Sequence, residues 1–509
     1  MNRTKVLVLI IVFVVVIDFT NGNLDKQDIS TVTCVLSNSK VFTQCQDSVC
    51  PSIISCIRKY ESSYSNINIH VENGYHICKQ TTDYKLKHHL HIDIRPLDQS
   101  SLTKPIFTCQ RDTSFLRLKT TFDLTINISN IVVDTNQLKQ FRGSLITIDA
   151  QSSNPSLSLY HEPNSNVLTL NNVVLNNANS MPSIKHYYTE AGSITLDYIS
   201  LIINNCTINN SQSTGGISSL SVMKIKANRL MIRHSTISNS QAFNGLSGIY
   251  FKGKDLEIFD TVFDGNSMPG TSFFTARTYN ASVTFSRFSN NKVKYGGCLV
   301  LHSDSVLIDS NVFDRNHGES ASALLFDSRD TENYLTNNSF TNNFALEQGT
   351  LYIGSGGNHY LNGSIFDSNI GKSAVDIYFG FRNLTMFGGT FINTTTISNN
   401  QNLSYPQFPE YALNMTTTVP MMERNPDLKG GCPSDFQTIQ LQNGNTTCLK
   451  IHYTNEPEYV YEEDDESWRP LHYIALLIIF LYFLIFCFLM YWLIRIIKII
   501  LNYLYKIIF

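Results

Sequence analysis

Five stretches of the sequence repeat one pattern: TVFDGN (261–266), SRFSNN (286–291), NVFDRN (311–316), NSFTNN (338–343) and SIFDSN (364–369). Each has Phe at its third position and Asn at its sixth, and successive copies start 25, 25, 27 and 26 residues apart. A unit of this length cannot bury its own apolar face, but stacked copies cover one another. The spacing therefore predicts a solenoid in which each hexapeptide is one corner of one coil.

The Phe position continues as an apolar residue in both directions along the chain. Its members are Val133, Leu175, Ile208, Ile237, Phe263, Phe288, Phe313, Phe340, Phe366 and Phe391. Five residues before each of these stands a second apolar residue: Ile128, Leu170, Ile203, Ile232, Ile258, Val283, Ile308, Leu335, Leu361 and Met386. This recurrence predicts two internal columns, in which each side chain packs on its equivalent one strand spacing, about 4.8 Å, away. The Asn of the hexapeptide is expected at a turn, where its amide bonds the next coil and its backbone is left-handed.

A third motif lies about halfway round each repeat and reads SGIYF, TSFFT, GCLVL, SALLF, GTLYI or SAVDI. Its inward candidates are Ile249, Phe273, Leu299, Leu324, Leu351 and Val375. The residue after each is more variable, as expected for the outer side of a short strand. Three of these outer residues, Tyr250, Phe274 and Tyr352, are aromatic. They are interpreted either as a stacking face for sugars or as ordinary strand surface.

Together these columns predict an all-β chain, a right-handed parallel β-helix with turns of Asn, Gly and Ser. A leucine-rich repeat would need its own Leu and Asn spacing, and the repeats have no helical periodicity. A propeller would need four strands per blade and a longer period.

Phe-x-x-Asn alternating with a Gly-Gly-small-apolar motif, here GGCL at 296–299, resembles the repeats of chlamydial polymorphic membrane proteins over residues 245–394. That resemblance implies surface display and adhesion. The chain departs from that family because it ends in one apolar segment instead of an outer-membrane barrel. More broadly, the expected fold is similar to the pectin-lyase-like superfamily, which includes polysaccharide lyases and hydrolases.

Both ends of the chain carry apolar segments. Residues 1–22 have a basic start and a short apolar run, which indicates a secretory signal peptide, with an N-terminal anchor as the alternative. Residues 473–494 form an uncharged apolar run followed by Arg495 and Lys498, which predicts one membrane crossing with a cytoplasmic tail. We therefore expect a single-pass type I protein of the plasma membrane or an endomembrane, with its ectodomain outside or lumenal. The predicted divisions are a signal peptide (1–22), a Cys-rich N-terminal cap (23–65), the β-helix (66–397), a linker, disulfide loop and acidic stalk (398–471), a transmembrane helix (472–494) and a tail (495–509).

Composition agrees with an exported protein. Charged residues make up 16% of the chain and the formal net charge is −3, so nucleic acid is not an expected partner. Asn-x-Ser/Thr sequons predict N-glycosylation on the surface. The candidates are Asn127, Asn205, Asn209, Asn280, Asn337, Asn362, Asn383, Asn393, Asn402, Asn414 and Asn445.

The cysteines predict disulfides rather than a zinc site, because no CxxC pair occurs among the eleven. Six are expected to pair with one another in an order that the sequence leaves open: Cys34, Cys45, Cys50, Cys56, Cys78 and Cys109. A separate bridge is predicted between Cys432 and Cys448. Near the first cluster, the apolar spacing of residues 50–60 predicts a helix that caps the solenoid, followed by a strand from residue 66.

Few residues suggest catalysis, and no cofactor or metal is expected. Asp264, Asp314 and Asp367 follow marker phenylalanines about two coils apart, which suits solvated turns better than an acid and base pair. His89, His91 and Asp93 lie on one face of a predicted strand and either bind a metal or form a polar surface.

The main functional hypothesis is a non-catalytic cell-surface glycoprotein whose β-helix serves adhesion or the recognition of glycans or proteins. One alternative is a membrane-tethered polysaccharide lyase or glycoside hydrolase. Another is a structural surface-coat protein without a specific ligand.

Overall fold

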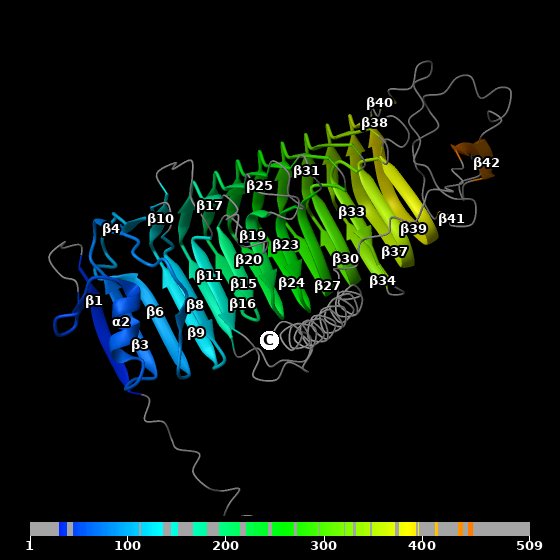
Figure 1. Cartoon of the computed structure of the whole chain (residues 1–509). Helices are drawn as coiled ribbons and strands as arrows, with labels where there is room; N and C mark the ends of the chain where they lie inside the picture. The colour runs from blue at the N-terminus through cyan, green and yellow to red at the C-terminus, as the bar shows by residue number, and fades with distance from the viewer. Residues whose placement is uncertain are drawn as a thin grey trace, which may run out of the picture. The chain divides into compact units, whose positions relative to one another are not determined.

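The computed structural model is a stack of parallel β-coils, which runs from β1 to β41 in Figure 1. It describes residues 30–37, 44–110, 113–135, 144–150, 166–180, 193–213, 220–242, 247–268, 272–294, 296–319, 321–328, 332–346, 349–371, 376–392, 395–396, 413–415, 436–440 and 446–450.

Each regular coil has four strand positions, which we call a, b, c and d. The coil of β23 (Ser247–Lys252), β24 (Asp255–Phe259), β25 (Val262–Asp264) and β26 (Ser267–Met268) shows them in order. Every strand pairs in parallel with the strand at the same position in the next coil. The short d strand does not correspond to any of the three motifs that the sequence analysis identified.

Equivalent strands continue the four layers in both directions. The a layer contains β5 (Tyr84–Lys85), β8 (Leu116–Thr120), β11 (Ile146–Ala150), β15 (Ile194–Asp197), β19 (Leu220–Lys226) and β33 (Leu324–Asp327). The b layer contains β1 (Thr31–Leu36), β3 (Asn66–Val71), β6 (Leu90–Pro96), β9 (Leu124–Ser129), β12 (Val167–Asn171), β16 (Ser200–Asn204), β20 (Arg229–Arg233), β34 (Glu332–Thr336) and β41 (Leu413–Met415).

The c layer contains β4 (Tyr75–Ile77), β7 (Ile106–Thr108), β10 (Val132–Asp134), β13 (Val174–Asn176), β17 (Thr207–Asn209), β21 (Thr236–Ser238), β28 (Arg287–Ser289), β31 (Val312–Asp314) and β35 (Ser339–Thr341). The d layer contains β14 (Asn179–Ser180), β18 (Gln212–Ser213), β22 (Gln241–Ala242), β29 (Lys292–Val293), β32 (His317–Gly318), β36 (Phe344–Ala345), β38 (Ile370–Gly371) and β40 (Thr395–Thr396). Four long strands pass through more than one layer: β27 (Ser272–Thr284), β30 (Leu299–Asp309), β37 (Leu351–Asp367) and β39 (Ile377–Ile392).

The two predicted internal columns are confirmed. Every marker from Val133 to Phe391 pairs in register with the next marker, and so do the residues from Ile128 to Met386. The rings of Phe263, Phe288, Phe313, Phe340 and Phe366 are fully buried. Their successive centroids lie 4.6, 4.9, 4.9 and 4.8 Å apart and the planes are within 14° of parallel. Burial of these rings is a main source of core stability in this part of the solenoid.

The third column is confirmed with two corrections. The register aligns Ile249 with Phe274, then with Leu299, Leu324, Leu351 and Ile377. The sequence predicted Phe273 and Val375 at two of these positions, so the inward residues were misplaced by one and by two places. Phe273 is also fully buried. The small residues before the strand are needed because a Cβ on Gly297 would lie 2.9 Å from the backbone of Ala323 in the next coil.

The predicted asparagine ladder is present at the corner after the c strand. Asn266, Asn291, Asn316, Asn343 and Asn369 are buried. The Nδ2 of Asn291 donates to Asn316 Oδ1 (3.0 Å) and to Phe263 O (3.0 Å), and its Oδ1 accepts the backbone N–H of Asn266 (3.1 Å). Stacked amides therefore satisfy polar groups that no solvent reaches.

The left-handed residue of this corner is not the ladder Asn, as the sequence predicted, but the residue before it. Gly265, Asn290, Arg315, Asn342 and Ser368 have φ between 53° and 65°. This turns the following Asn into the interior, where its amide meets its neighbours.

A second polar ladder at the corner between b and c was not predicted. It runs through Cys206, Ser235, Thr261, Ser286, Asn311, Asn338 and Ser364, all of them buried. The Oδ1 of Asn311 accepts the backbone N–H of Ser286 (2.8 Å), and the Oγ of Ser286 accepts that of Thr261 (3.1 Å). Here too the preceding residue is left-handed, as at Asn337 (φ 54°).

The N-terminal end is capped by α2 (Ile53–Tyr60), as predicted. The Oγ of Ser52 accepts the backbone N–H of Ser55 (3.1 Å) and so caps the helix. Ile53 and Ile57 are buried against the first coils. The first strand of the stack lies before this helix, because β1 pairs in register with β3. The solenoid therefore begins near residue 31 rather than at the predicted residue 66.

All six predicted cysteines form disulfides, and the structure decides their order: Cys34–Cys56, Cys45–Cys50 and Cys78–Cys109. The first ties α2 to β1, the second joins β2 (Val49–Cys50) to the segment before it, and the third links the segments after β4 and β7.

Several predictions concern residues outside the described part of the chain. These are the signal peptide, the acidic stalk, the apolar run 473–494 and the tail. Within the described residues, none of the helices has the length and hydropathy that a bilayer crossing requires. β42 (Phe436–Gln440) and β43 (Thr446–Lys450) form an antiparallel pair, but Cys432 lies outside the description, so its bridge to Cys448 stays a prediction.

Candidate functional site

A shallow pocket of about 420 Å³ lies on the outer face of the b layer near the N-terminal cap. Its lining comes from the starts of adjacent b strands and the residues before them: Ser65, His89, Leu90, His91, Asp123 and Thr125. Register explains the grouping, because His91 of β6 pairs with Asn66 of β3 and Thr125 of β9.

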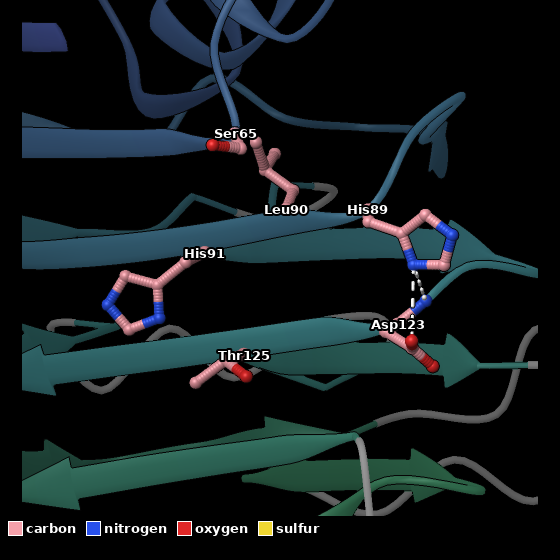
Figure 2. Close-up of a pocket in the computed structure, with 6 residues that line it drawn as sticks. All are labelled: Ser65, His89, Leu90, His91, Asp123 and Thr125. Atoms are coloured by element: carbon pink, nitrogen blue, oxygen red, sulfur yellow. Dashed lines mark hydrogen bonds and ion pairs between the residues drawn. The ribbon is translucent and has the colours of Figure 1, made fainter. Parts of the chain in front are cut away.

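His89 and Asp123 form the interacting pair of this pocket (Figure 2). The Nδ1 of His89 lies 3.2 Å from Oδ2 of Asp123 and 3.1 Å from the backbone N of the same residue. A protonated Nδ1 donates to the carboxylate, and an unprotonated one accepts the backbone N–H. Both side chains are more than half exposed, so their attraction is weak.

His89, His91 and Asp93, which the sequence allowed either as metal ligands or as a polar surface, do not converge. Figure 2 shows the ring of His91 directed away from His89 and Asp123. Asp93 Oδ2 lies 3.4 Å from Nε of Arg95. Within the described residues, ligand atoms of His, Cys, Asp or Glu converge in threes at Cys34, Cys50 and Cys56, which are disulfide-bonded. The pocket is therefore a polar surface of the b layer and not a set of converging metal ligands.

The predicted aromatic face of Tyr250, Phe274 and Tyr352 is not formed. Phe274 is fully buried and belongs to the inward column, so Thr275 takes the outward place beside Tyr250. The outward column then continues through Val300 and Leu325, which form a small buried cluster with Ala321 on the outer side. Tyr352 packs against that cluster.

The aspartates next to the Phe column accept hydrogen bonds from the following coil. Asp264 Oδ1 accepts from Ser289 Oγ (2.7 Å) and Asn290 Nδ2 (2.7 Å). Asp314 Oδ1 accepts in the same way from Thr341 Oγ1 (3.1 Å) and Asn342 Nδ2 (3.2 Å). These carboxylates tie neighbouring coils together.

Asp314 has further partners on its second oxygen. The guanidinium of Arg315 lies 2.9 Å from Oδ2 and that of Arg287 lies 3.2 Å from it. Burial alone would raise the pKa of this carboxyl, but the hydrogen bonds from Arg315, Asn342 and Thr341 outweigh burial and place the pKa below 3.8. Asp367 accepts from Ser368 Oγ (2.8 Å).

A row of basic side chains on the a layer was missed by the sequence analysis. Lys226, Lys252, Arg277 and His302 occupy one outward position in successive coils. Next to it, Lys224, Tyr250 and Thr275 form the adjacent row. These cations become visible as a set only once the strands are aligned, and a one-residue slip in the TSFFT motif hid them.

The described sequons lie on the b and c sides of the coils. Asn127 is on the outer face of β9, Asn280 and Asn362 stand within the b portions of β27 and β37, and Asn209 ends β17. Asn205 and Asn337 occupy left-handed positions between b and c. Asn383 and Asn414 lie in strands whose side chains are outside the description, and Asn393, Asn402 and Asn445 are outside it altogether.

The free thiols of the described region are interior. Cys206 and Cys298 are both buried, and burial raises the pKa of each. Cys206 belongs to the polar ladder, where its Sγ accepts the backbone N–H of Val173 (3.4 Å).

One of the comparisons with known proteins supports the fold. A family model described as "Right handed beta helix region" matches residues 216–402. A solved mannuronic acid specific polysaccharide family 6 lyase from human gut microbiota is similar over 66% of this chain and 83% of its own, with 13% identity and a TM-score of 0.34. No curated protein matches the sequence.

Proposed function

We propose that this protein is a non-catalytic recognition glycoprotein of a membrane surface, which displays a right-handed β-helix to bind glycans or other surface molecules. The observation that carries the proposal is that the carboxylates beside the Phe column are engaged in hydrogen bonds between coils. Asp264 and Asp314 accept hydrogen bonds from the following coil, so their lone pairs serve the stack.

Acid and base catalysis needs a different arrangement. In glycoside hydrolysis two carboxylates must face one bond at a fixed separation, and in any acid and base mechanism the catalytic base must reach the proton that it removes. Asp264 and Asp314 belong to coils separated by the coil of Ser289. Two strand spacings, about 10 Å, therefore lie between them.

The a layer provides the recognition surface in this proposal. Tyr250 is half-buried and lies between Lys224 and Thr275, so an aromatic ring, a cation and a hydroxyl stand side by side. Such rings contribute to sugar binding through apolar contact. The predicted signal peptide, sequons and membrane segment fit display at the surface.

The test uses the full-length chain expressed with its sugars. It is applied to a glycan array, and product release is measured on a panel of polysaccharides with and without calcium. We expect binding without product. The Tyr250→Ser variant should bind about three- to tenfold more weakly, whereas Tyr279→Ser, at an exposed tyrosine outside the row, should bind like the unmodified chain. Release of unsaturated or hydrolysed sugar would overturn the proposal in favour of a polysaccharide-cleaving enzyme.

A further inference from the structure

The basic row on the a layer concentrates positive charge in a chain whose formal net charge is −3. Lys226, Lys252, Arg277 and His302 follow one another in register. Buried Ile225, Phe251, Ala276 and Leu301 precede them, so the four side chains point outward. Neighbours are one strand spacing apart, and the row spans about 14 Å.

Elsewhere the solenoid sets opposite charges beside each other. Arg117 and Lys119 face Asp83, and Arg229 and Arg233 face Glu257. In the row, by contrast, neither Lys226 nor Lys252 forms an ion pair with the part of the chain that the structure describes.

Carboxylates stand at the two ends of the row. Asp197 precedes Lys226 in register, and Asp327 follows His302, with 4.0 Å between His302 Nδ1 and Asp327 Oδ2. Two like charges about 5 Å apart repel by roughly 1 kcal/mol in water and more near a protein surface. A bound anion would relieve this repulsion.

An independent observation points to the same face. The described sequons, Asn127, Asn205, Asn209, Asn280, Asn337 and Asn362, lie in the b and c layers or at the corner between them. The described a strands contain no sequon. Attached sugars would therefore crowd two sides of the coil and leave the a face accessible to a large ligand.

We propose that this row binds a linear, densely sulfated polysaccharide laid along the axis of the solenoid. The inference rests on the proposed function and names the ligand class for it. Lys226, Lys252 and Arg277 present a cation on three successive coils, at a spacing close to the length of one sugar ring. A glycan with anions on every ring matches this density, whereas a glycan with one carboxylate on alternate rings leaves every second cation unmatched. Tyr250 and Thr275 in the adjacent row contact the sugar rings.

The experiment measures the affinity of the full-length glycosylated chain for three size-matched probes: heparin, hyaluronan and neutral dextran. Heparin should bind most tightly, hyaluronan weakly and dextran not at all, and added salt should weaken binding because it screens the charges. The variant Lys226→Gln with Lys252→Gln and Arg277→Gln should lose about tenfold or more in heparin affinity.

The matched control removes the same charge elsewhere: Arg229→Gln, Lys292→Gln and Arg315→Gln. Each affected carboxylate keeps another cation, since Arg233 remains beside Glu257 and Arg287 beside Asp314. The control should bind heparin within about twofold of the unmodified chain, because distant surface charges are screened.

Equal losses in the row variant and the control would overturn the site, because net charge alone would then explain binding. Hyaluronan binding as tightly as heparin would overturn the argument from charge density. Enzymatic removal of N-linked sugars should leave heparin affinity unchanged. A tenfold gain in heparin affinity would show that attached sugars cover the a layer, against the argument from the sequons.

The two proposals fail separately. If the chain binds array glycans through Tyr250 but does not bind heparin, the proposed ligand class is wrong and the proposed recognition function stands. If the chain cleaves heparin, the proposal of a non-catalytic function is wrong, and the basic row stands as the binding site.

Discussion

The coils before residue 240 and those from residue 261 to 371 fill the same interior column with different side chains. In the earlier coils the marker column is aliphatic, with Val133, Leu175, Ile208 and Ile237, and the gaps between markers are 42, 33 and 29 residues. In the later coils the column is phenylalanine and the repeat keeps to 25–27 residues.

The corner between the b and c strands also differs between the two regions. Ile131 and Val173 are buried at the b–c corner of the early coils, where Asn311 and Asn338 stand later. The early coils carry the three disulfides, and the later ones carry the stacked rings and the amide ladder. One fold is therefore held by covalent links and aliphatic packing at one end and by directional side-chain stacks at the other. Four predictions test this difference, from the largest expected effect to the smallest.

The largest effect is expected for Phe313→Ala in the middle of the ring stack. This change removes two parallel contacts, with Phe288 and Phe340, and leaves a cavity, so it should cost about 3–5 kcal/mol. The denaturation midpoint checks it. Phe285→Ala, at a ring that is 57% exposed, is the matched control and should change little. Phe313→Leu serves if the Ala variant does not fold, and a midpoint unchanged by either would show that the stack is not needed.

The second effect concerns the early coils. Replacing Cys78 and Cys109 together with Ser should destabilise the N-terminal coils by about 3 kcal/mol, because a closed loop of 31 residues is released in the unfolded chain. Hydrogen exchange should rise in β4 and β7 and stay constant in β31 and β35. Replacing Cys298 with Ser, at a buried thiol outside any disulfide, is the control. Uniform loss of protection along the solenoid would mean that the two regions unfold as one unit.

Acid should loosen the early coils first. Burial lowers the pKa of His76, which stacks on Phe107 at 5.0 Å and bonds Glu72 O through Nε2. Its contribution to stability is complete above pH 6.5, the ordinary pKa, and is lost as pH falls through the lowered value. The pKa of Asp314 is lowered from 3.8, so the contribution of that carboxylate is retained until pH falls below this value.

Burial also lowers the pKa of His317, which follows β31 in the later coils, but His317 is only half-buried whereas His76 is buried. Hydrogen exchange at pH 7 and pH 5, corrected for the intrinsic rate, should therefore show a larger loss of protection in β4 than in β31. The His76→Phe variant should remove that loss. Equal sensitivity of both strands would contradict the assignment to His76.

The smallest effect is expected when Asn replaces Ser310 at the left-handed position between the b and c strands. Ser310 has φ 57°, in a position that Asn130, Asn172 and Asn205 occupy in earlier coils and Asn337 occupies in the next coil. Asn tolerates this conformation better than Ser, so Ser310→Asn should stabilise the chain by up to about 1 kcal/mol. Ser310→Val should destabilise it because branched side chains resist positive φ. The thermal unfolding midpoint of each variant checks this prediction. Equal midpoints for the two variants and the unmodified chain would show that backbone strain at this corner does not affect stability.

How much the sequence could predict differs between the inside and the outside of the coil. The columns of Phe313 and Ile308 were identified correctly because an interior position must be apolar in every coil, and that constraint repeats visibly. The ladder of Asn316 was found because the same residue type, Asn, recurs in every one of the five hexapeptides. The second ladder was missed because Cys, Ser, Thr and Asn share that corner. The Cys, Ser and Asn members accept a backbone N–H of the preceding coil, whereas the Oγ1 of Thr261 donates to the carbonyl of Ile232.

The sequence by itself determined a stacked, parallel solenoid with an apolar interior, since only neighbouring coils can bury a repeat of this length. The tertiary structure decided the outer surface: which way Phe274 points, which cations align with Lys252, and which cysteine joins Cys34. Outward positions vary from coil to coil because water accepts many side chains. Their grouping therefore depends on strand register, where a shift of one residue exchanges the inner face with the outer one.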